Sequence, residues 1–401
     1  MAGPLGGIKV VEMGVWVAAP AAGGILADWG ADVVKIEPPG LGDPARSFSK
    51  MYGADLPFNP PFEMDNRNKR SIVVDARTEA GLEVVHALLA EADVFVTNVR
   101  PAGLARLGLD HASLLERYPK LVYGVITGYG LDGPEADRAA YDIAAFWARA
   151  GVAEALRYPD QPPPFQRGGM GDHNTGLALA GAVSAALVER ARTGKGQLVS
   201  TSLLREGLYT LSFDLAFGLR LGVPIQKANR AAMPNPAINS YQDQDGAWFW
   251  IVGLEGERHW PPLCRAIGRP EWIESERYGT PAARAANAAE LIAEIDAIFA
   301  TKTRAEWGAL FDAEEDLWWA PVQTSDEIFA DEQVMAAGGF AEIPDGPTTT
   351  MLPATPVDFG TSVIEHRHMA PEHGEHTDEV LAEVGRSADE IAKLRESGAV
   401  G

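Results

Sequence analysis

The sequence predicts an α/β protein with a doubly wound, mainly parallel sheet in its first part and a second domain further along. The chain has 401 residues, of which 46% are hydrophobic and 22% charged, enough for more than one core. In the first third, short β-branched runs alternate with helical patterns, as in successive βαβ units. Pro224, Pro234 and Pro236 then mark a change of region.

Five strands and two helices are expected in the first third. The helices cover 20–29 and 78–90, where apolar residues recur at helical spacing, with Pro20 suited to a first turn and Thr78 to an N-cap. The strands are expected at 8–11, 32–36, 71–74, 93–96 and 121–126.

A glycine-rich loop at 168–176 carries Asp172 and precedes the most apolar stretch, 177–188, which is expected to be a buried helix. This stretch falls well short of the roughly 20 residues that span a bilayer, so no membrane segment is expected. Before a helix, Asp172 meets unpaired N–H groups and the positive end of the helix dipole. It is either a plain N-cap or a reactive carboxylate, kept ionised by those N–H groups, which also stabilise an oxyanion.

The later part of the chain shows mixed elements. From 206 to 230 a long helix is expected to run into a linker, and Trp248, Phe249 and Trp250 indicate an aromatic strand at 246–252. Further helices are expected at 258–266, 288–299, 304–311, 377–384 and 388–396.

Charge and cysteine content restrict the possible partners. The net charge of -22 argues against a nucleic-acid surface, which needs a basic face. No charged segment followed by an apolar run opens the chain, so a cytoplasmic protein is expected. The single cysteine, Cys264, cannot form an internal disulfide and is expected to be a small buried side chain.

Several common motifs are absent. No Gly-x-Gly-x-x-Gly follows the first strand, and neither a P-loop nor a Gly-x-Ser-x-Gly elbow occurs. Nicotinamide dehydrogenases, P-loop enzymes and serine hydrolases are therefore disfavoured. Four histidines, His366, His368, His373 and His376, could hold zinc or copper. Because no cysteine accompanies them and the spacing fits no known site, a polar connector is favoured and no metal is expected.

Further segments, in order along the chain, resemble the class III (CaiB/BaiF-type) CoA-transferases, a family that includes formyl-CoA transferase and α-methylacyl-CoA racemase. They are GGIKVVE at 6–12, GADVVKIE at 30–37, NRNKRS at 66–71, DVFVTN at 93–98 followed by Arg100-Pro101, GDHNTG at 171–176, TGKGQ at 193–197 and GEHTDEVL at 374–381. The last segment also accounts for part of the histidine cluster.

The resemblance implies a Rossmann-like large domain made from both chain ends, an inserted smaller α+β domain and an interlocked homodimer. The corresponding limits are 1–205 for the N-terminal part of the large domain, 206–230 for a linker, 231–330 for the small domain and 331–401 for the returning part.

The resemblance also implies a reaction. Asp172 attacks an acyl-CoA thioester, and CoA moves to a carboxylic acid through an anhydride and an aspartyl-CoA thioester. Acyl-CoA and a carboxylic acid are then the substrates. CoA is a co-substrate, and no permanently bound cofactor or metal is implied.

Matching positions suggest contacts to CoA. Asn98 and Arg106 match residues near the nucleotide and pantetheine, and Lys69 and Arg70 are cations suited to phosphates. Pro38 and Ala139 stand where formyl-CoA transferase has basic contacts, for which Arg46 or Arg138 are candidate replacements.

Three residues are expected to contact the acyl group: Trp16, Val17 and Tyr141. Val17 replaces a glutamine that handles the small dicarboxylate of formyl-CoA transferase, which makes formyl or oxalyl transfer doubtful. Trp16, together with Trp248, Trp250, Trp318 and Trp319, either lines a site for a larger acyl group or belongs to the core.

Two alternatives stay open. An α-methylacyl-CoA racemase of the same family uses a histidine where this chain has Tyr141, and tyrosine is a poor base at neutral pH. A non-catalytic acyl-CoA-binding protein is the other alternative, against which the intact Asp172 argues.

Overall fold

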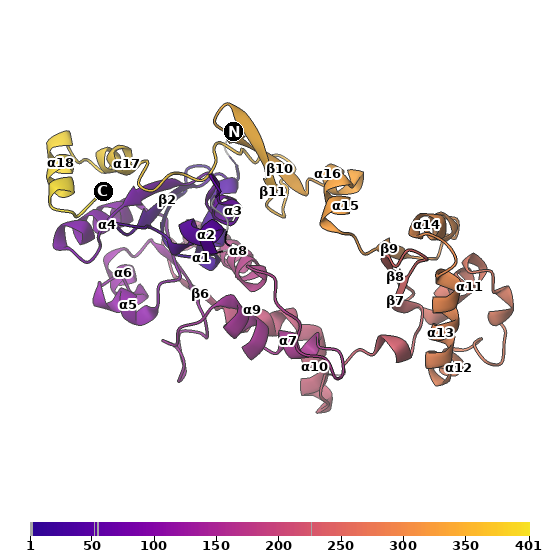
Figure 1. Cartoon of the computed structure of the whole chain (residues 1–401). Helices are drawn as coiled ribbons and strands as arrows, with labels where there is room; N and C mark the ends of the chain where they lie inside the picture. Colours follow the sequence, from indigo (N-terminus) through magenta and orange to yellow (C-terminus); the bar gives the residue numbers. More distant parts are fainter. Residues whose placement is uncertain (1–2, 52, 54–55, 226) are drawn as a thin grey trace. The chain divides into compact units, whose positions relative to one another are not determined.

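The computed structural model describes residues 3–51, 53, 56–225 and 227–401 (Figure 1). The chain divides into two compact units. The larger takes in the described residues of Met1–Ala155, Pro164–Ile225 and Gly338–Gly401, and the smaller those of Leu156–Pro163 and Gln226–Ala337. The domain limits expected from the sequence stay a prediction.

The larger unit is built on a six-stranded parallel sheet. Its strands are β1 (Lys9–Met13), β2 (Asp32–Glu37), β3 (Arg70–Val73), β4 (Val94–Thr97), β5 (Val122–Thr127) and β6 (Leu198–Ser202). The order β3-β2-β1-β4-β5-β6 is that of a doubly wound fold, which confirms the predicted α/β class. Strand β6 was not predicted, because this edge strand is only half apolar and carries Ser200, Thr201 and Ser202.

Helices cover both faces of this sheet. The helices of the larger unit are α1 (Ala18–Asp28), η1 (Pro44–Ser47), α2 (Phe48–Met51), α3 (Pro60–Asn66), α4 (Glu79–Glu91), α5 (Pro101–Arg106), α6 (His111–Arg117), η2 (Ile143–Arg149), α7 (Val152–Ala155), α8 (Met170–Thr193), α9 (Leu203–Thr210), α10 (Ser212–Leu221), α17 (Thr377–Glu383) and α18 (Ala388–Glu396). A hairpin, β10 (Phe340–Asp345) and β11 (Thr348–Pro353), completes the unit.

The alternation of side chains along the strands divides the core into two layers. Val10 and Val33 pack in one cluster with residues of α1 and α8, whereas their neighbours Val11 and Val34 pack with residues of α4, α17 and α18. Near-continuous apolar strands are typical of a parallel sheet with both faces covered.

Seven predicted helices are confirmed, those at 20–29, 78–90, 258–266, 288–299, 304–311, 377–384 and 388–396, and two need correction. Helices α1 and α4 form, and Thr78 caps α4 by accepting a hydrogen bond from the Gly81 N–H. The long helix expected after Glu206 is instead two helices, which meet at Leu211. Helix α8 starts at Met170 rather than at the apolar run, since a first turn needs no apolar residues, and Val188 on it is exposed.

The smaller unit has a three-stranded antiparallel sheet in the order β7-β8-β9 with helices packed around an aromatic core. Its elements are η3 (Arg230–Ala232), β7 (Ile238–Gln242), β8 (Trp248–Val252), α11 (Gly256–Ala266), η4 (Pro270–Trp272), α12 (Pro281–Ala286), α13 (Ala288–Phe299), α14 (Arg304–Asp312), β9 (Trp319–Pro321), α15 (Ser325–Ala330) and α16 (Glu332–Ala336). The predicted aromatic strand is β8. In the part of the chain that is described, no helix has the length and apolarity needed to cross a membrane.

Candidate active site

The candidate site begins with the loop that follows β1, at the carboxyl edge of the sheet. The strand order switches direction between β1 and β4, where open α/β sheets bind ligands. Asn98, directly after β4, accepts a hydrogen bond from the Val15 N–H at 2.9 Å and donates one to the Val15 carbonyl at 2.7 Å. This side chain therefore fixes the loop in place.

Trp16 is held in an unusual backbone conformation by this loop. Its φ is +65°, in the left-handed region, which costs a non-glycine residue on the order of 1 kcal/mol. The Trp16 N–H donates to Asp43 at 2.9 Å. The indole then lies against Phe48 and, edge to face, against Tyr141, with ring centroids 5.6 and 5.7 Å away.

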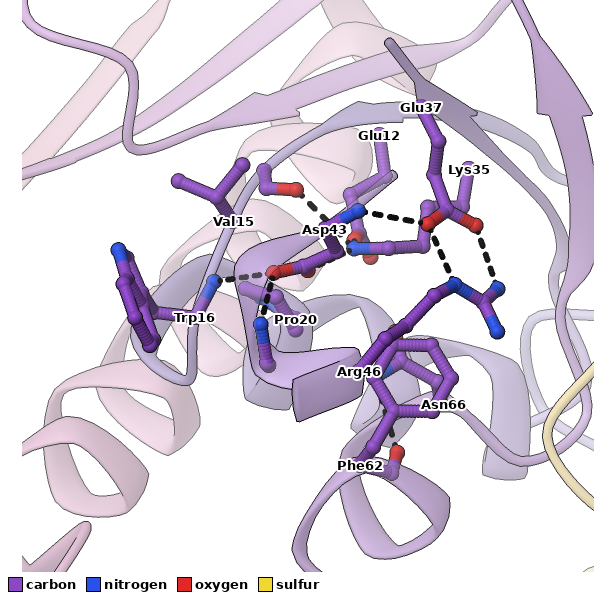
Figure 2. Close-up of polar contacts among 12 residues, drawn as sticks. Glu12, Val15, Trp16, Pro20, Lys35, Glu37, Asp43, Arg46, Phe62 and Asn66 are labelled. Atoms are coloured by element: carbon purple, nitrogen blue, oxygen red, sulfur yellow. Dashed lines mark hydrogen bonds and ion pairs between the residues drawn. The ribbon is translucent and has the colours of Figure 1, made fainter. Parts of the chain in front are cut away.

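A buried ionic network holds Asp43 in place (Figure 2). The Lys35 ammonium lies 2.9 Å from Asp43 and 2.8 Å from Glu12, and Lys69 lies 2.7 Å from the other oxygen of Glu12. All four side chains are completely buried. Because two carboxylates face two ammonium groups, the network is neutral, which a buried cluster of charges requires.

Glu37 forms a second buried pair beside this network, also drawn in Figure 2. Arg46 donates two hydrogen bonds to its carboxylate, at 2.6 and 2.8 Å, and Ser71 donates a third. Burial opposes ionisation, but the hydrogen bonds from Arg46 and the charges of Lys35 and Arg46 lower the pKa of Glu37 to about 2.

Asp172 lies in the first turn of α8, where Gly169 with a φ of +74° is the N-cap. It is therefore not itself an N-cap. Burial, followed by the charge of Asp142, raises the pKa of Asp172 to about 7, although the charge of His173 acts in the opposite direction. The pKa of Asp172 is thus shifted in the direction opposite to the one expected from the helix N–H groups.

The physical reason is that Asp142 occupies the helix N–H groups. Its Oδ2 accepts hydrogen bonds from the N–H groups of Gly171 at 3.1 Å and Asp172 at 3.4 Å, and its Oδ1 accepts one from the Gln166 amide. The carboxylate that benefits from the helix dipole is Asp142. Asp172 feels the repulsion of Asp142 instead.

These groups surround a cavity of about 740 Å³ in the larger unit. Its wall is mainly apolar and aromatic but also includes three carboxylates and a histidine. The lining residues are Trp16, Val17, Phe48, Met51, Pro61, Met64, Asp65, Tyr141, Asp142, Ile143, Phe165, Gln166, Arg167, Gly168, Gly169, Asp172 and His173. Asp172 and the three residues expected to contact the acyl group thus share one cavity.

Comparisons with known proteins identify the family. Residues 5–377 match the family described as CoA-transferase family III. The chain is 34% identical to (R)-2-hydroxy-4-methylpentanoate CoA-transferase of Clostridioides difficile, with 99% of each chain covered. The chain belongs to this family.

Two further proteins extend the likeness. Cinnamoyl-CoA:phenyllactate CoA-transferase of Clostridium sporogenes is 35% identical over 97% of this chain and 95% of its own. The crystal structure of a CAIB/BAIF family protein from Brucella suis superposes with a TM-score of 0.84 at 33% identity, covering 96% of this chain and all of that one. The family III membership makes this chain an enzyme that uses CoA as a co-substrate.

The predicted CoA contacts of this family III member lie outside the cavity. Lys69 has no exposed surface, and its ammonium is hydrogen-bonded to Glu12, Pro20 and Asn66, so a phosphate contact does not fit its placement. Arg70 is paired with three carboxylates, from Asp32, Glu379 and Glu383.

Other proposed cations differ in their availability. Arg106 is exposed in the last turn of α5, where it is accessible to a ligand. Arg46 is committed to Glu37, and Arg138 to Glu135. Of the two suggested replacements for a basic contact, neither has a free guanidinium.

Sequence reasoning missed five polar residues of the cavity, which are Asp65, Asp142, Gln166, Arg167 and His173. His173 stands inside the motif used for recognition and Asp142 directly follows Tyr141, so their positions were visible but their roles were not. Asp65 and Gln166 carry no sequence signal. Among the described residues, no group of three or more histidine, cysteine or acidic side chains is arranged to hold a metal ion.

Proposed function

We propose that this enzyme moves CoA from an acyl-CoA to a carboxylic acid through covalent intermediates on Asp172. The observation that carries the proposal is the position of Asp172 in the wall of a large, mainly apolar cavity, within the first turn of α8. A nucleophile in such a site has to be close to the thioester and shielded from water.

The proposed steps balance without a metal or redox group. A carboxylate oxygen of Asp172 attacks the thioester carbonyl, the C–S bond breaks, and CoA leaves as a thiolate. The thiolate attacks the aspartyl carbonyl of the resulting anhydride, and the donor acid leaves as a carboxylate. The acceptor carboxylate then reverses these steps on the aspartyl-CoA thioester.

The cavity favours an apolar acyl group of moderate size. Trp16, Phe48, Tyr141 and Phe165 supply aromatic surface, and Val17 supplies no hydrogen bond to a small dicarboxylate. Two relatives are named for 2-hydroxy-4-methylpentanoate and for cinnamoyl and phenyllactate groups. We propose branched aliphatic or aromatic acids as substrates.

We further propose the interlocked homodimer and a cytoplasmic location. Exposed aromatic and aliphatic side chains on α9 and α10, including Tyr209, Phe213, Phe217 and Leu219, offer surface for a second copy. Light scattering is expected to give twice the protomer mass at micromolar concentration, and a monomer would contradict the dimer. Cell fractionation tests the location.

A trapping experiment tests the covalent mechanism. Incubation with cinnamoyl-CoA followed by hydroxylamine is expected to convert the aspartyl-CoA thioester to a hydroxamate, which shifts the mass of the peptide carrying Asp172. Asp389→Asn is the control and should still form the adduct on Asp172, because Asp389 is likewise an acid in the first turn of a helix, α18, but is exposed. An active enzyme with no adduct on this peptide would rule the mechanism out.

The racemase alternative predicts a different product. Incubation of a 2-methylacyl-CoA in deuterated water is expected to leave the α-proton in place, since Tyr141 stands where a racemase has histidine. Rapid deuterium incorporation that is lost in Asp172→Ala would favour the racemase. Binding of acyl-CoA without any exchange of CoA would favour a non-catalytic binding protein.

A further inference from the structure

The cavity wall has an imbalance of charge. Three carboxylates line it, those of Asp65, Asp142 and Asp172, and among the lining residues only Arg167 and His173 can carry a positive charge. A free acid arrives as a carboxylate and has to approach Asp172 closely. The carboxylate of the acid and the carboxylates of the cavity wall repel one another at close range. Binding of an acid therefore requires a cationic hydrogen-bond donor.

His173 is placed to act as this donor. It follows Asp172 on α8, and its N–H donates to the Gly169 carbonyl at 2.8 Å. Its ring lies against Gly169, where an added Cβ would come within 2.9 Å of the ring carbon Cε1. A side chain at Gly169 would therefore push the imidazole away from its place in the cavity wall.

Asp65 orients the ring from the other side. Its carboxylate, in α3, is almost fully buried, and its Oδ1 lies 3.0 Å from Nε2 of His173. A buried carboxylate needs a charged partner, and His173 supplies one when it is protonated on both nitrogens. With Nε2 directed to Asp65, the Nδ1–H is the second donor.

The charges that face the imidazole favour the doubly protonated form. Burial lowers the pKa of His173, but the hydrogen bond and charge of Asp65, followed by the charges of Asp172 and Asp142, outweigh burial and raise it above the ordinary value. Arg167, directly before Gly168, is the other lining residue that can carry a positive charge, and it is exposed.

We propose that His173, oriented by Asp65, binds the carboxylate of the free acid beside Asp172. The inference rests on the proposed function and identifies the subsite of the acid. In one half of the reaction the imidazolium receives the departing donor acid, and in the other half it holds the acceptor acid. His173 forms a charge-assisted hydrogen bond and transfers no proton. Asp65 is a positioning residue.

Direct binding of acids tests this assignment without any need for turnover. Asp172→Asn serves as the background, because its neutral amide resembles the uncharged aspartyl thioester that meets the acid. Phenyllactate and 2-hydroxy-4-methylpentanoate are titrated into this protein by calorimetry from pH 6 to pH 9, with cinnamoyl-CoA as a second ligand. The acids stay ionised throughout this range, so a change with pH reports on the protein.

Acid affinity is expected to fall as pH rises, because the imidazolium loses its proton. Adding His173→Asn is expected to weaken acid binding at pH 6 about tenfold or more and to remove the pH dependence, while cinnamoyl-CoA binds as before. Adding Asp65→Asn is expected to move the fall to lower pH, which loss of packing alone would not do. Adding Arg167→Gln is expected to leave the pH dependence intact.

Either of two results would overturn the subsite. One is that the acids bind equally well with and without His173→Asn. The other is that neither acid binds the Asp172→Asn background at millimolar concentration. These results are distinct from a failure of the proposed function, because hydroxylamine trapping in the wild-type enzyme tests the aspartyl adduct separately.

Discussion

The carboxylates of Glu12, Glu37 and Asp43 lie beneath the β1–α1 loop with cationic partners, whereas Asp142 and Asp172 share a cavity wall with few cations. The pairing lowers the pKa of Glu37 to about 2, and the crowding raises that of Asp172 to about 7. Both groups are substantially buried, so the difference lies in their neighbours. We therefore expect the paired charges to hold the shape of the site and the crowded ones to set the reactivity of the proposed nucleophile.

The two groups of carboxylates are connected through Trp16. Asp43, which is paired with Lys35, holds the Trp16 N–H, and the indole of Trp16 lines the cavity that contains Asp172. Damage to the paired group should therefore lower stability, and damage to the crowded group should change activity and its pH dependence.

The largest effect is expected from Asp172→Asn. Loss of the nucleophile should lower the rate of CoA transfer by about three orders of magnitude or more, with acyl-CoA binding retained. A CoA-exchange assay followed by mass spectrometry measures this rate, and circular dichroism checks the fold. Near-normal transfer would show that the crowded carboxylate is not the nucleophile.

In the paired group, Lys35→Met is expected to lower stability. Removal of the ammonium leaves Asp43 as a buried carboxylate without its cationic partner, while Glu12 keeps Lys69, and this should cost about 3–5 kcal/mol of unfolding free energy. The control is Lys9→Met, since Lys9 and Glu91 form an exposed pair that adds little to stability. Urea unfolding measures both variants. Equal losses would mean that the buried network does not support the loop.

Asp142→Asn is expected to change the pH profile of the reaction. In the proposed mechanism Asp172 attacks as a carboxylate, so wild-type kcat/KM should rise with pH through about 7. Asparagine keeps an acceptor for the α8 N–H groups but removes the charge that raises the pKa of Asp172. The rise should therefore move to lower pH.

Asp132→Asn is the control for this variant, because Asp132 is exposed and lies outside the cavity. It is expected to leave the profile unchanged. A profile that stays in place in Asp142→Asn would show that burial alone sets the pKa of Asp172.

The sequence predicted the sheet well because apolar strands buried on both faces leave a strong local pattern, whereas β6, a half-polar edge strand, leaves a weak one. It also predicted that Asp172, Trp16, Val17 and Tyr141 lie close together, and all four line one cavity, while their roles stay predictions. The sequence could not predict the raised pKa of Asp172. That value depends on Asp142, whose carboxylate reaches the start of α8 only when distant segments fold together.

The predicted phosphate contact of Lys69 does not fit the structure for a related reason, because burial is a property of the whole fold. A lysine beside an arginine suggests an exposed basic patch, but the ammonium of Lys69 turns inward to Glu12 while Arg70 reaches the carboxylates of Glu379 and Glu383. The residues around Lys69 and Arg70 in the sequence do not predict where either side chain points. The direction follows from which face of the sheet each side chain meets.

The smallest effect is expected from Trp16, where the two groups of carboxylates meet. Trp16→Ala removes an aromatic wall from the cavity, so kcat/KM for cinnamoyl-CoA should fall about tenfold relative to acetyl-CoA, which is too small to fill the cavity. Trp16→Phe keeps an aromatic face and should restore most of this preference. Relief of the left-handed backbone does not explain such a result, because alanine and phenylalanine are both strained at a φ of +65°. If both variants lower the rates with cinnamoyl-CoA and acetyl-CoA equally, then the network below Trp16 positions the loop for catalysis in general and does not select the acyl group.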